Sequence, residues 1–164
     1  MRLKVGLNVA SVRAAVDALE RYRESLPAKC DEFCRRMAEE GCEVAIATVR
    51  KDTGALASSI RVERQGQAAY LLLADEEYAA FVEFGTGVVG QGSYQGELPA
   101  QWGYDERRTP EAHDPVDPTL WYYYDAEGRR RSTRGQTANG FMLAGSEAMR
   151  AAMLPVAREV FGRD

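Results

Sequence analysis

The stretch YAAFVEFGTGVVG (residues 78–90) combines aromatic residues, one carboxylate and several glycines. Its apolar positions have the spacing of a short helical turn, with Tyr78, Phe81 and Phe84 as the aromatic members. Gly85 follows directly, and glycine is the usual residue just past the end of a helix. The stretch therefore predicts a corner. The aromatic side chains would hold a chain reversal on the core, and the glycines would supply backbone angles closed to other residues.

Glycines at a chain reversal also suggest a phosphate-binding loop. A loop of that kind has Lys-Ser or Lys-Thr after its glycines, at the start of a helix. Here Gly85, Thr86 and Gly87 are followed by Val88, and no lysine or arginine occurs from residue 65 to residue 106. The same segment contains seven carboxylates, which would repel an anion. We therefore expect no nucleotide and no other cofactor.

Glu83 is the carboxylate within the stretch, and a general base is one role to consider. General acid–base chemistry requires a second positioned group and a pocket. Asp75 and Glu77 are nearby carboxylates, but nothing in the sequence pairs them with Glu83. We favour the more ordinary role, in which the carboxylate caps backbone N–H groups or pairs with an arginine. His113 has no recognisable nucleophile context, and we expect no catalytic residue.

The composition is that of one folded domain. A chain of 164 residues with 45% apolar content fits a single domain over residues 1–164. The net charge of −4 argues against a free-standing nucleic-acid binder, because such proteins are usually basic. No run of about 18 apolar residues occurs, so we expect no membrane span. The N-terminus lacks the apolar core of a signal peptide, so we expect folding in the cytoplasm.

The cysteines Cys30, Cys34 and Cys42 all fall in one predicted helix. Cys30 and Cys34 are four residues apart and share a helix face with Phe33 and Met37. In a reducing compartment such cysteines are usually small buried hydrophobic residues. Their spacing matches no zinc-binding pattern. We therefore expect buried thiols without a metal ion or a disulfide.

The N-terminal third predicts a strand followed by two helices. Residues 3–9 alternate apolar and polar side chains, which is typical of a half-buried strand. Ser11 is a candidate N-cap for a first helix, which Pro27 would end because proline has no N–H for the helical hydrogen bond. Pro27 also suits the first turn of a second helix. The apolar stripe of that helix runs to about Arg50, a length of roughly 35 Å.

Turn signals and alternation predict the elements that follow. Residues 52–54 form a turn, and residues 65–67 read as the turn of a hairpin that joins strands near 60–63 and 70–74. Residues 119–125 predict a further strand. A last helix should begin at about Phe141.

We expect Asn139 to cap the last helix and Pro155 to kink or split it. Residues 88–118 form a long segment rich in glycine and proline, which in a compact domain is usually functional or ordered by a partner. It also carries aromatic residues, which are costly to leave in water, so we expect it to become ordered at an interface.

Four motifs occur together in this order: KDTGALASSI (51–60), YAAFVEFGTG (78–87), WYYYD (121–125) and GFMLAGSEAM (140–149). In this combination the sequence resembles the head–tail joining or tail-completion family of long-tailed bacteriophages and prophages, over roughly residues 10–160. The matching positions are Asp52, Thr53, Gly54, Leu56, Ser59, Ile60, Tyr78, Ala79, Val82, Glu83, Phe84, Gly85, Thr86 and Phe141. Two departures are that no proline stands next to Phe141, and that segment 88–118 varies too widely in the family for its contacts to be carried over.

The resemblance implies an α+β fold, in which an antiparallel sheet is packed by a long helix of the N-terminal half and by a C-terminal helix, with a long irregular loop at about 88–118. It also implies a non-enzymatic virion protein of the phage neck or tail, which is assembled in the bacterial host cytoplasm and acts as a ring of identical subunits. The implied partners are other copies of the chain, capsid connector or portal-side proteins, and tail terminator or tail-tube proteins. The structural motif would then comprise Asp52, Thr53, Gly54, Tyr78, Glu83, Phe84, Gly85, Thr86 and Gly87.

A closed ring requires that one surface of each subunit meets a different surface of the next. We predict assembly contacts at Trp102 and Tyr104 and at a cluster formed by Arg129, Arg130, Arg131 and Arg134. The alternative for the arginines is a solvated hairpin. Two alternatives for the whole protein remain open: a small cytoplasmic enzyme such as a hydrolase, and a module that contacts packaged DNA through the arginines.

Overall fold

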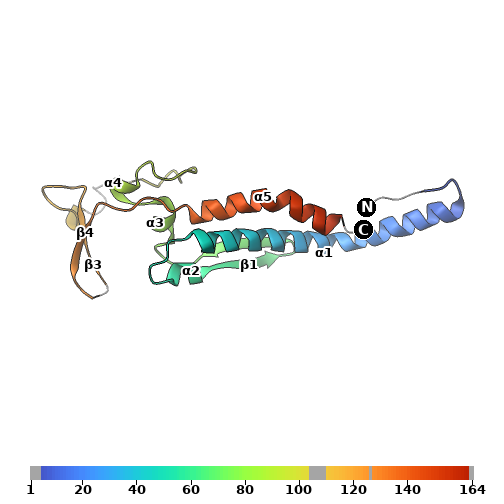
Figure 1. Ribbon diagram of the computed structural model, residues 1–164, viewed down its shortest axis with the longest axis horizontal. Coiled ribbons are helices and arrows are strands. Elements are labelled where there is room, and N and C mark those ends of the chain that lie inside the picture. Colours follow the sequence, from blue (N-terminus) through green and yellow to red (C-terminus); the bar gives the residue numbers. More distant parts are fainter. Residues whose placement is uncertain (1–4, 104–109, 126, 163–164) are drawn as a thin grey trace.

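The computed structural model describes residues 5–103, 110–125 and 127–162. Figure 1 shows an elongated molecule in which two long helices lie side by side and one of them projects beyond the other. The predicted α+β class is confirmed. None of the described helices has both the length and the apolar content needed to cross a membrane. The elements are α1 (Val9–Thr48), α2 (Ala55–Ser59), β1 (Ile60–Gly66), β2 (Ala69–Ala74), α3 (Ala79–Phe84), α4 (Gly87–Gly90), η2 (Pro110–Ala112), β3 (Trp121–Tyr124), β4 (Arg130–Thr133) and α5 (Phe141–Phe161).

Helix α1 is 40 residues long, or about 60 Å at 1.5 Å per residue. Asn8 is its N-cap, and the Asn8 side chain accepts a hydrogen bond from the backbone N–H of Ser11 at 2.8 Å. The prediction that Ser11 caps the helix is therefore wrong. The strand predicted over residues 3–9 is also wrong where it can be compared, because residues 5–8 are irregular and Val9 is helical.

The helix also continues through Pro27, where the sequence predicted its end. Proline removes one N–H from the ladder of helical hydrogen bonds, and the carbonyl group that loses this partner belongs to Arg23. Pro27 and Arg23 both occupy exposed positions, so the missing bond falls on the solvent side of the helix. One long helix therefore replaces the two that were predicted.

The strands form two separate antiparallel hairpins within the described residues. In the first, β1 pairs with β2 from Ile60↔Ala74 to Arg64↔Tyr70, which confirms the hairpin predicted around residues 65–67. In the second, β3 pairs with β4 from Trp121↔Thr133 to Tyr124↔Arg130. Figure 1 shows β1 and β2 alongside the C-terminal half of α1, whereas β3 and β4 stand away from the packed helices. The predicted single sheet is therefore two hairpins, each of two strands.

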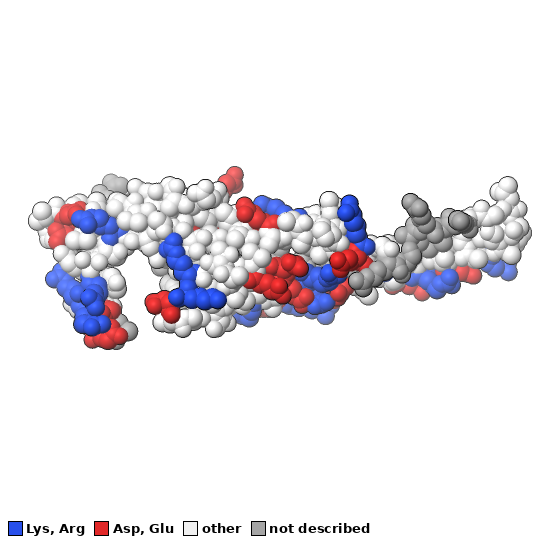
Figure 2. Space-filling model, in the orientation of Figure 1, with Lys and Arg blue, Asp and Glu red and all other residues white. Residues whose placement is uncertain are grey.

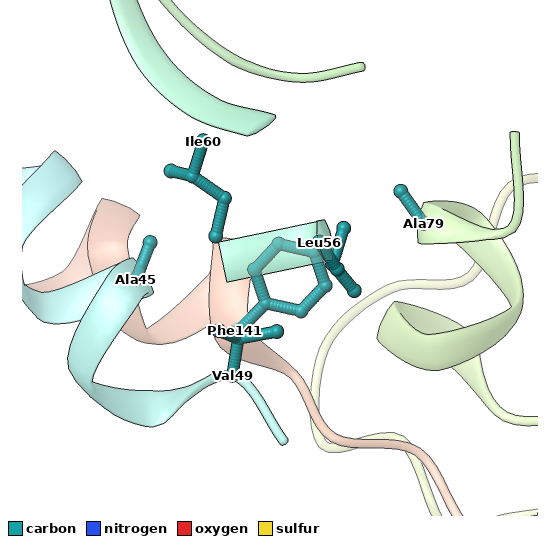
Figure 3. Close-up of a cluster of buried hydrophobic side chains, with 6 residues drawn as sticks. All are labelled: Ala45, Val49, Leu56, Ile60, Ala79 and Phe141. Atoms are coloured by element: carbon teal, nitrogen blue, oxygen red, sulfur yellow. The ribbon is translucent and has the colours of Figure 1, made fainter. Parts of the chain in front are cut away.

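The main core joins the C-terminal end of α1 to the start of α5. Phe141 is fully buried at its centre and packs among small and aliphatic side chains from α1, α2, β1 and α3. Figure 3 shows the six members of this cluster: Ala45, Val49, Leu56, Ile60, Ala79 and Phe141. This core therefore brings the predicted corner at residues 78–90 against the first turn of α5.

Helices α1 and α5 run antiparallel and approach closely at two glycines. A Cβ atom built on Gly145 would lie 2.7 Å from the carbonyl oxygen of Gly41, so neither helix has room for a side chain there. Further along, Met37 packs with Val156 and Val160 in a second buried cluster. Pro155 lies inside α5, which continues past it to Phe161.

The cysteines of α1 are free, as the sequence predicted, but they are not all buried. Cys30 is exposed, while Cys34 and Cys42 are half-buried. The prediction of burial is thus wrong for Cys30, because α5 ends near the neighbouring Phe33 and does not cover this turn of α1. Burial raises the pKa of the Cys34 and Cys42 thiols above the usual value. Among the described residues, no group of three or more His, Cys, Asp and Glu side chains could hold a metal ion.

Candidate functional site

The predicted corner is organised around Glu83, which is 4% exposed although it carries a carboxylate. Its Oε2 accepts a hydrogen bond from the backbone N–H of Met142 at 2.8 Å, and its Oε1 accepts one from the backbone N–H of Leu143 at 3.0 Å. The Tyr94 hydroxyl group donates to the same Oε1 at 3.0 Å. Both carboxylate oxygens are therefore occupied by groups of the protein itself.

Glu83 acts as the N-cap of α5 from a distant part of the chain. The first N–H groups of a helix have no partner within the helix, and the residue that precedes α5, Gly140, makes no side-chain capping bond. The carboxylate of Glu83 fills this role from 59 and 60 positions away in the sequence. A negative charge at a helix N-terminus is also favoured by the helix dipole, which explains a buried carboxylate here.

The backbone strengthens the same junction. The N–H of Gly140 donates to the carbonyl oxygen of Glu83 at 3.1 Å, and the N–H of Asn139 donates to that of Val82 at 2.9 Å. The entry into α5 is therefore fixed to α3 by both main-chain and side-chain hydrogen bonds. The environment of Glu83 also raises the pKa of Tyr94 to about 12, chiefly by burial of the phenol and secondly by its hydrogen bond to the carboxylate.

The aromatic residues of the corner are arranged differently from the prediction. On α3, the buried positions are Ala79 and Glu83, four residues apart, whereas Tyr78 and Phe81 are exposed. Phe84 is half-buried. Residues four apart lie on one face of a helix, and it is this small-and-acidic face that meets α5. The side chains of Phe81 and Phe84 instead face the irregular segment that follows.

Trp102, which lies in that segment, packs against Phe81 and Phe84. The ring centroids lie 5.6 Å apart for Phe81 and Trp102 and 4.9 Å apart for Phe84 and Trp102. Tyr94 packs edge-on against Phe84 at 5.0 Å. These contacts fold the first half of segment 88–118 back onto the corner within the single chain. Tyr104, the other predicted contact of this segment, lies outside the described residues.

Gly85 has the backbone conformation that the sequence predicted. It is the C-cap of α3, with φ 78° and ψ 169°, and its N–H donates to the carbonyl oxygen of Phe81 at 3.1 Å. A Cβ atom on Gly85 would lie 2.7 Å from the backbone nitrogen of Ala138. The next residue, Thr86, forms an antiparallel bridge with Gln136. The corner therefore packs directly against the extended segment around Gln136 and Ala138 that leads into α5.

Asn139, the predicted cap of α5, instead serves the end of α1. Its Nδ2 group donates to the carbonyl oxygen of Thr48 at 3.3 Å, and its Oδ1 accepts from the backbone N–H of Arg50 at 3.1 Å. The Arg50 guanidinium group also donates to the hydroxyl oxygen of Thr137 at 2.7 Å. The prediction for Asn139 is thus wrong in its target: Asn139 caps the end of α1, and the start of α5 is capped by Glu83 of α3.

The Asp-Thr-Gly motif forms the turn between α1 and α2. Gly54 is the N-cap of α2 with φ 84°, and the Thr53 hydroxyl oxygen accepts a hydrogen bond from the N–H of Ala55 at 3.3 Å. Asp52 is exposed. The turn places Leu56 in the main core, so the motif positions the first hairpin relative to α1. Among the described residues, no hydrogen bond joins this motif to Glu83.

The arginine cluster lies on and beside the second hairpin, where acidic side chains meet it (Figure 2). Arg129 and Arg131 both bind Asp125, at 3.0 Å and 2.9 Å, and Arg134 binds Asp117 at 2.6 Å. The guanidinium group of Arg130 lies 3.7 Å from the centroid of the Tyr122 ring. The repulsion expected among four like charges is therefore relieved locally. The arginine side chains of the three ion pairs remain 49–61% exposed.

A cleft of about 650 Å³ opens beside the corner. Its lining includes Phe81, Phe84, Trp102, His113 and Trp121, together with backbone of the glycine-rich stretch. The wall is mainly apolar and aromatic, and Glu83 is not part of it. A cleft of this kind can hold an apolar side chain of a neighbouring protein. The carboxylate of the corner motif, Glu83, does not line it and so cannot act as an acid or base there.

Sequence patterns could not identify Tyr94, Arg50 or Gln136 as members of this junction. Each acts on a residue at least 11 positions away, and none stands in a motif of its own. The sequence singled out Glu83, but it did not identify the groups that bind its carboxylate, which are Tyr94 and the backbone N–H groups of Met142 and Leu143. The site is therefore a structural lock that fixes α3, the end of α1 and the start of α5 to one another.

Residues 13–85 match the HK97-gp10-like family model, which is described as "Bacteriophage HK97-gp10, putative tail-component". The matched region runs from α1 to the end of α3, so it includes both Glu83 and Gly85. This finding confirms the resemblance to a phage tail family that the motifs indicated. No curated protein and no solved structure matches the chain.

Proposed function

We propose that this chain is a structural protein of the phage neck, which completes the tail or joins it to the head connector as part of a ring of identical subunits. The observation that carries the proposal is the match of residues 13–85 to a family of phage tail components. A phage tail component has a structural role and a place in the virion. The neck position, the ring and the attachment to the connector are the parts that we propose.

The chemistry of Glu83 supports a structural role for the corner. A general base needs a free oxygen within reach of a substrate proton. Both oxygens of Glu83 accept hydrogen bonds from backbone or tyrosine donors, and the residue is buried. The carboxylate that the sequence singled out is therefore committed to holding α5 in place. This use of the motif suits a rigid scaffold on which the surrounding segments meet other proteins.

The second hairpin is a suitable surface for a neighbouring subunit. A hairpin of two strands is marginally stable in isolation, and β3 and β4 pair only with each other among the described strands. Tyr123 and Tyr124 of β3 are exposed, as are arginines of the cluster. We propose that residues 129–131 and Arg134 contact an acidic surface of the next subunit or of another neck protein. Such exposed pairs are worth only about 0–1 kcal/mol each, so the contact would depend on repetition around the ring.

Trp102 differs from the arginine cluster, because we do not propose that it contacts a neighbouring subunit directly. Its ring already packs on Phe81 and Phe84 within the subunit, at the edge of the apolar cleft. We propose that it shapes the cleft that receives a side chain of a neighbour. Its contribution to assembly would then be indirect.

The decisive experiment compares virions made with and without this protein, using the phage or prophage that encodes it. Without the protein, electron microscopy should show DNA-filled heads beside separate tails, and the titre should recover when the wild-type chain is supplied from a plasmid. Particles of normal appearance and infectivity in its absence would exclude the proposed role. Tails of aberrant length attached to heads would place the protein in length control and would likewise contradict it.

A further inference from the structure

The N-terminal half of α1 projects past the end of α5 and has no helix beside it in the described structure (Figure 1). Helix α5 ends at Phe161, whose ring packs on Phe33 of α1 at 5.8 Å. Toward the N-terminus from this point, α1 continues for more than 20 residues. Four apolar side chains of this part are 47–78% exposed, namely Val9, Val12, Val16 and Leu19, and Leu26 is half-buried. Such a contiguous apolar stripe marks an interaction surface more often than an ordinary solvated one.

The exposed stripe is the continuation of the seam that α5 already covers. Residues 9, 12, 16, 19 and 26 repeat at intervals of three, four and seven, and the same series leads to Phe33 and Met37 under α5. A repeat of this kind keeps one face of a helix toward a partner helix. Residues 9–26 therefore carry about 27 Å of helix–helix seam that α5 does not cover.

The charges beside the seam favour a second copy of this chain as the occupant. Arg13 and Glu20 are seven residues apart, so they lie on the same flank of the stripe. In an antiparallel pair of identical helices, equivalent flanks face each other, so Arg13 of each copy would meet Glu20 of the other. The opposite flank carries Ala15 and Tyr22. A parallel pair would set the charged flank against that uncharged one and leave the charges unpaired.

We propose that two copies of this chain associate through residues 9–26 of α1 as an antiparallel, twofold-symmetric helix pair. The register that brings Arg13 to Glu20 of the second copy also sets Val16 against Leu19 of that copy. Arg23 falls within the stripe opposite Val12 of the second copy, where its stem packs and its guanidinium group reaches solvent. A polar residue at such a position weakens the pair but favours one register. The contact is isologous and so differs from the ring contact of the proposed function.

Sedimentation of the purified full-length chain tests the pair, over a range of protein concentrations and at low and high salt. The wild-type protein should reach a mass twice that of the 18.2 kDa chain. Val16→Asp should weaken the pair by at least about tenfold, because it buries a charge in the seam. Ala14→Asp is the matched control, since it adds the same charge on the exposed opposite face of α1, and it should leave the mass unchanged. Circular dichroism should give equal helix content for both variants.

Charge exchange tests the antiparallel orientation. Arg13→Glu and Glu20→Arg should each weaken the pair, and the double variant should restore it, because each change alone sets like charges opposite each other. Arg23→Leu should strengthen it. A monomeric wild-type chain, an oligomer whose mass Val16→Asp does not change, or a double variant weaker than both single variants would overturn the proposal. These measurements use free protein, so their failure would leave the role in the virion to be decided by the particle experiment.

Discussion

Replacing Glu83 with glutamine tests the lock between the corner and α5 with a minimal change in shape. A glutamine side chain has one acceptor oxygen where glutamate has two. If that oxygen takes the place of Oε1, it keeps the hydrogen bonds from Leu143 and Tyr94. The amide nitrogen then faces the backbone N–H of Met142, which loses its acceptor at 2.8 Å. The substitution also removes a negative charge from the N-terminus of α5.

The expected loss of stability follows from these two changes. A hydrogen bond to a charged group contributes about 1.5–3 kcal/mol, and a charge at a helix terminus contributes about 0.3–1 kcal/mol, or up to about 2 when partly buried. The two changes overlap, so Glu83→Gln should lower the free energy of unfolding by about 2–4 kcal/mol. For a chain of this length that corresponds to a fall of about 4–16 °C in Tm.

Thermal and urea unfolding measure the effect, and amide hydrogen exchange locates it. Glu77→Gln is the matched control, because it makes the same chemical change at an exposed position next to α3. In Glu83→Gln, the amides of Met142 and Leu143 should exchange faster while those in the middle of α1 keep their protection. A Tm within about 2 °C of the Glu77→Gln value, or unchanged exchange at the start of α5, would refute the capping role of Glu83.

Three further predictions address the glycine corner, the arginine cluster and the second hairpin. Gly85→Ala should lower stability by more than Gly92→Ala, since both glycines have positive φ but only Gly85 lacks space for a Cβ atom; equal melting temperatures would contradict this. Exchange of the arginines at 129–131 for glutamine should leave the chain folded and reduce its incorporation into particles. Exchange for lysine, which keeps the charge, should reduce incorporation less. Normal incorporation of the glutamine variant would show that the arginines belong to a solvated hairpin. The pKa of Asp125 is lowered in the folded protein, first by a hydrogen bond from the backbone N–H of Arg129. The ionised Asp125 side chain therefore stabilises the fold above the usual pKa of an aspartate, and this stabilisation is lost as the pH falls through the lowered pKa of the folded state. Near-ultraviolet circular dichroism should therefore show the hairpin loosening at acidic pH, and the Asp125→Asn variant should lack that transition.

Much of the secondary structure was determined by local sequence. The apolar spacing after residue 27 predicted the part of α1 that packs on α5, and the glycine at residue 66 with alternating neighbours predicted the first hairpin. Gly85 could be assigned to the end of α3 because helix termination depends on a few adjacent residues. The start of α5 at Phe141 was also predicted correctly, although the expected cap, Asn139, serves α1 instead.

The tertiary structure alone decided how these pieces are joined. Pro27 predicted a helix end, but the loss of one hydrogen bond on an exposed face does not stop a helix that continues in both directions. Asn139 had the composition of a cap, yet it caps α1, and Glu83 caps α5 from 59 positions away. Local patterns record which residues can satisfy a helix end, because that depends on side-chain chemistry. Which helix end they satisfy depends on the packing of distant segments around Phe141, and a pattern that extends over a few residues does not contain that information.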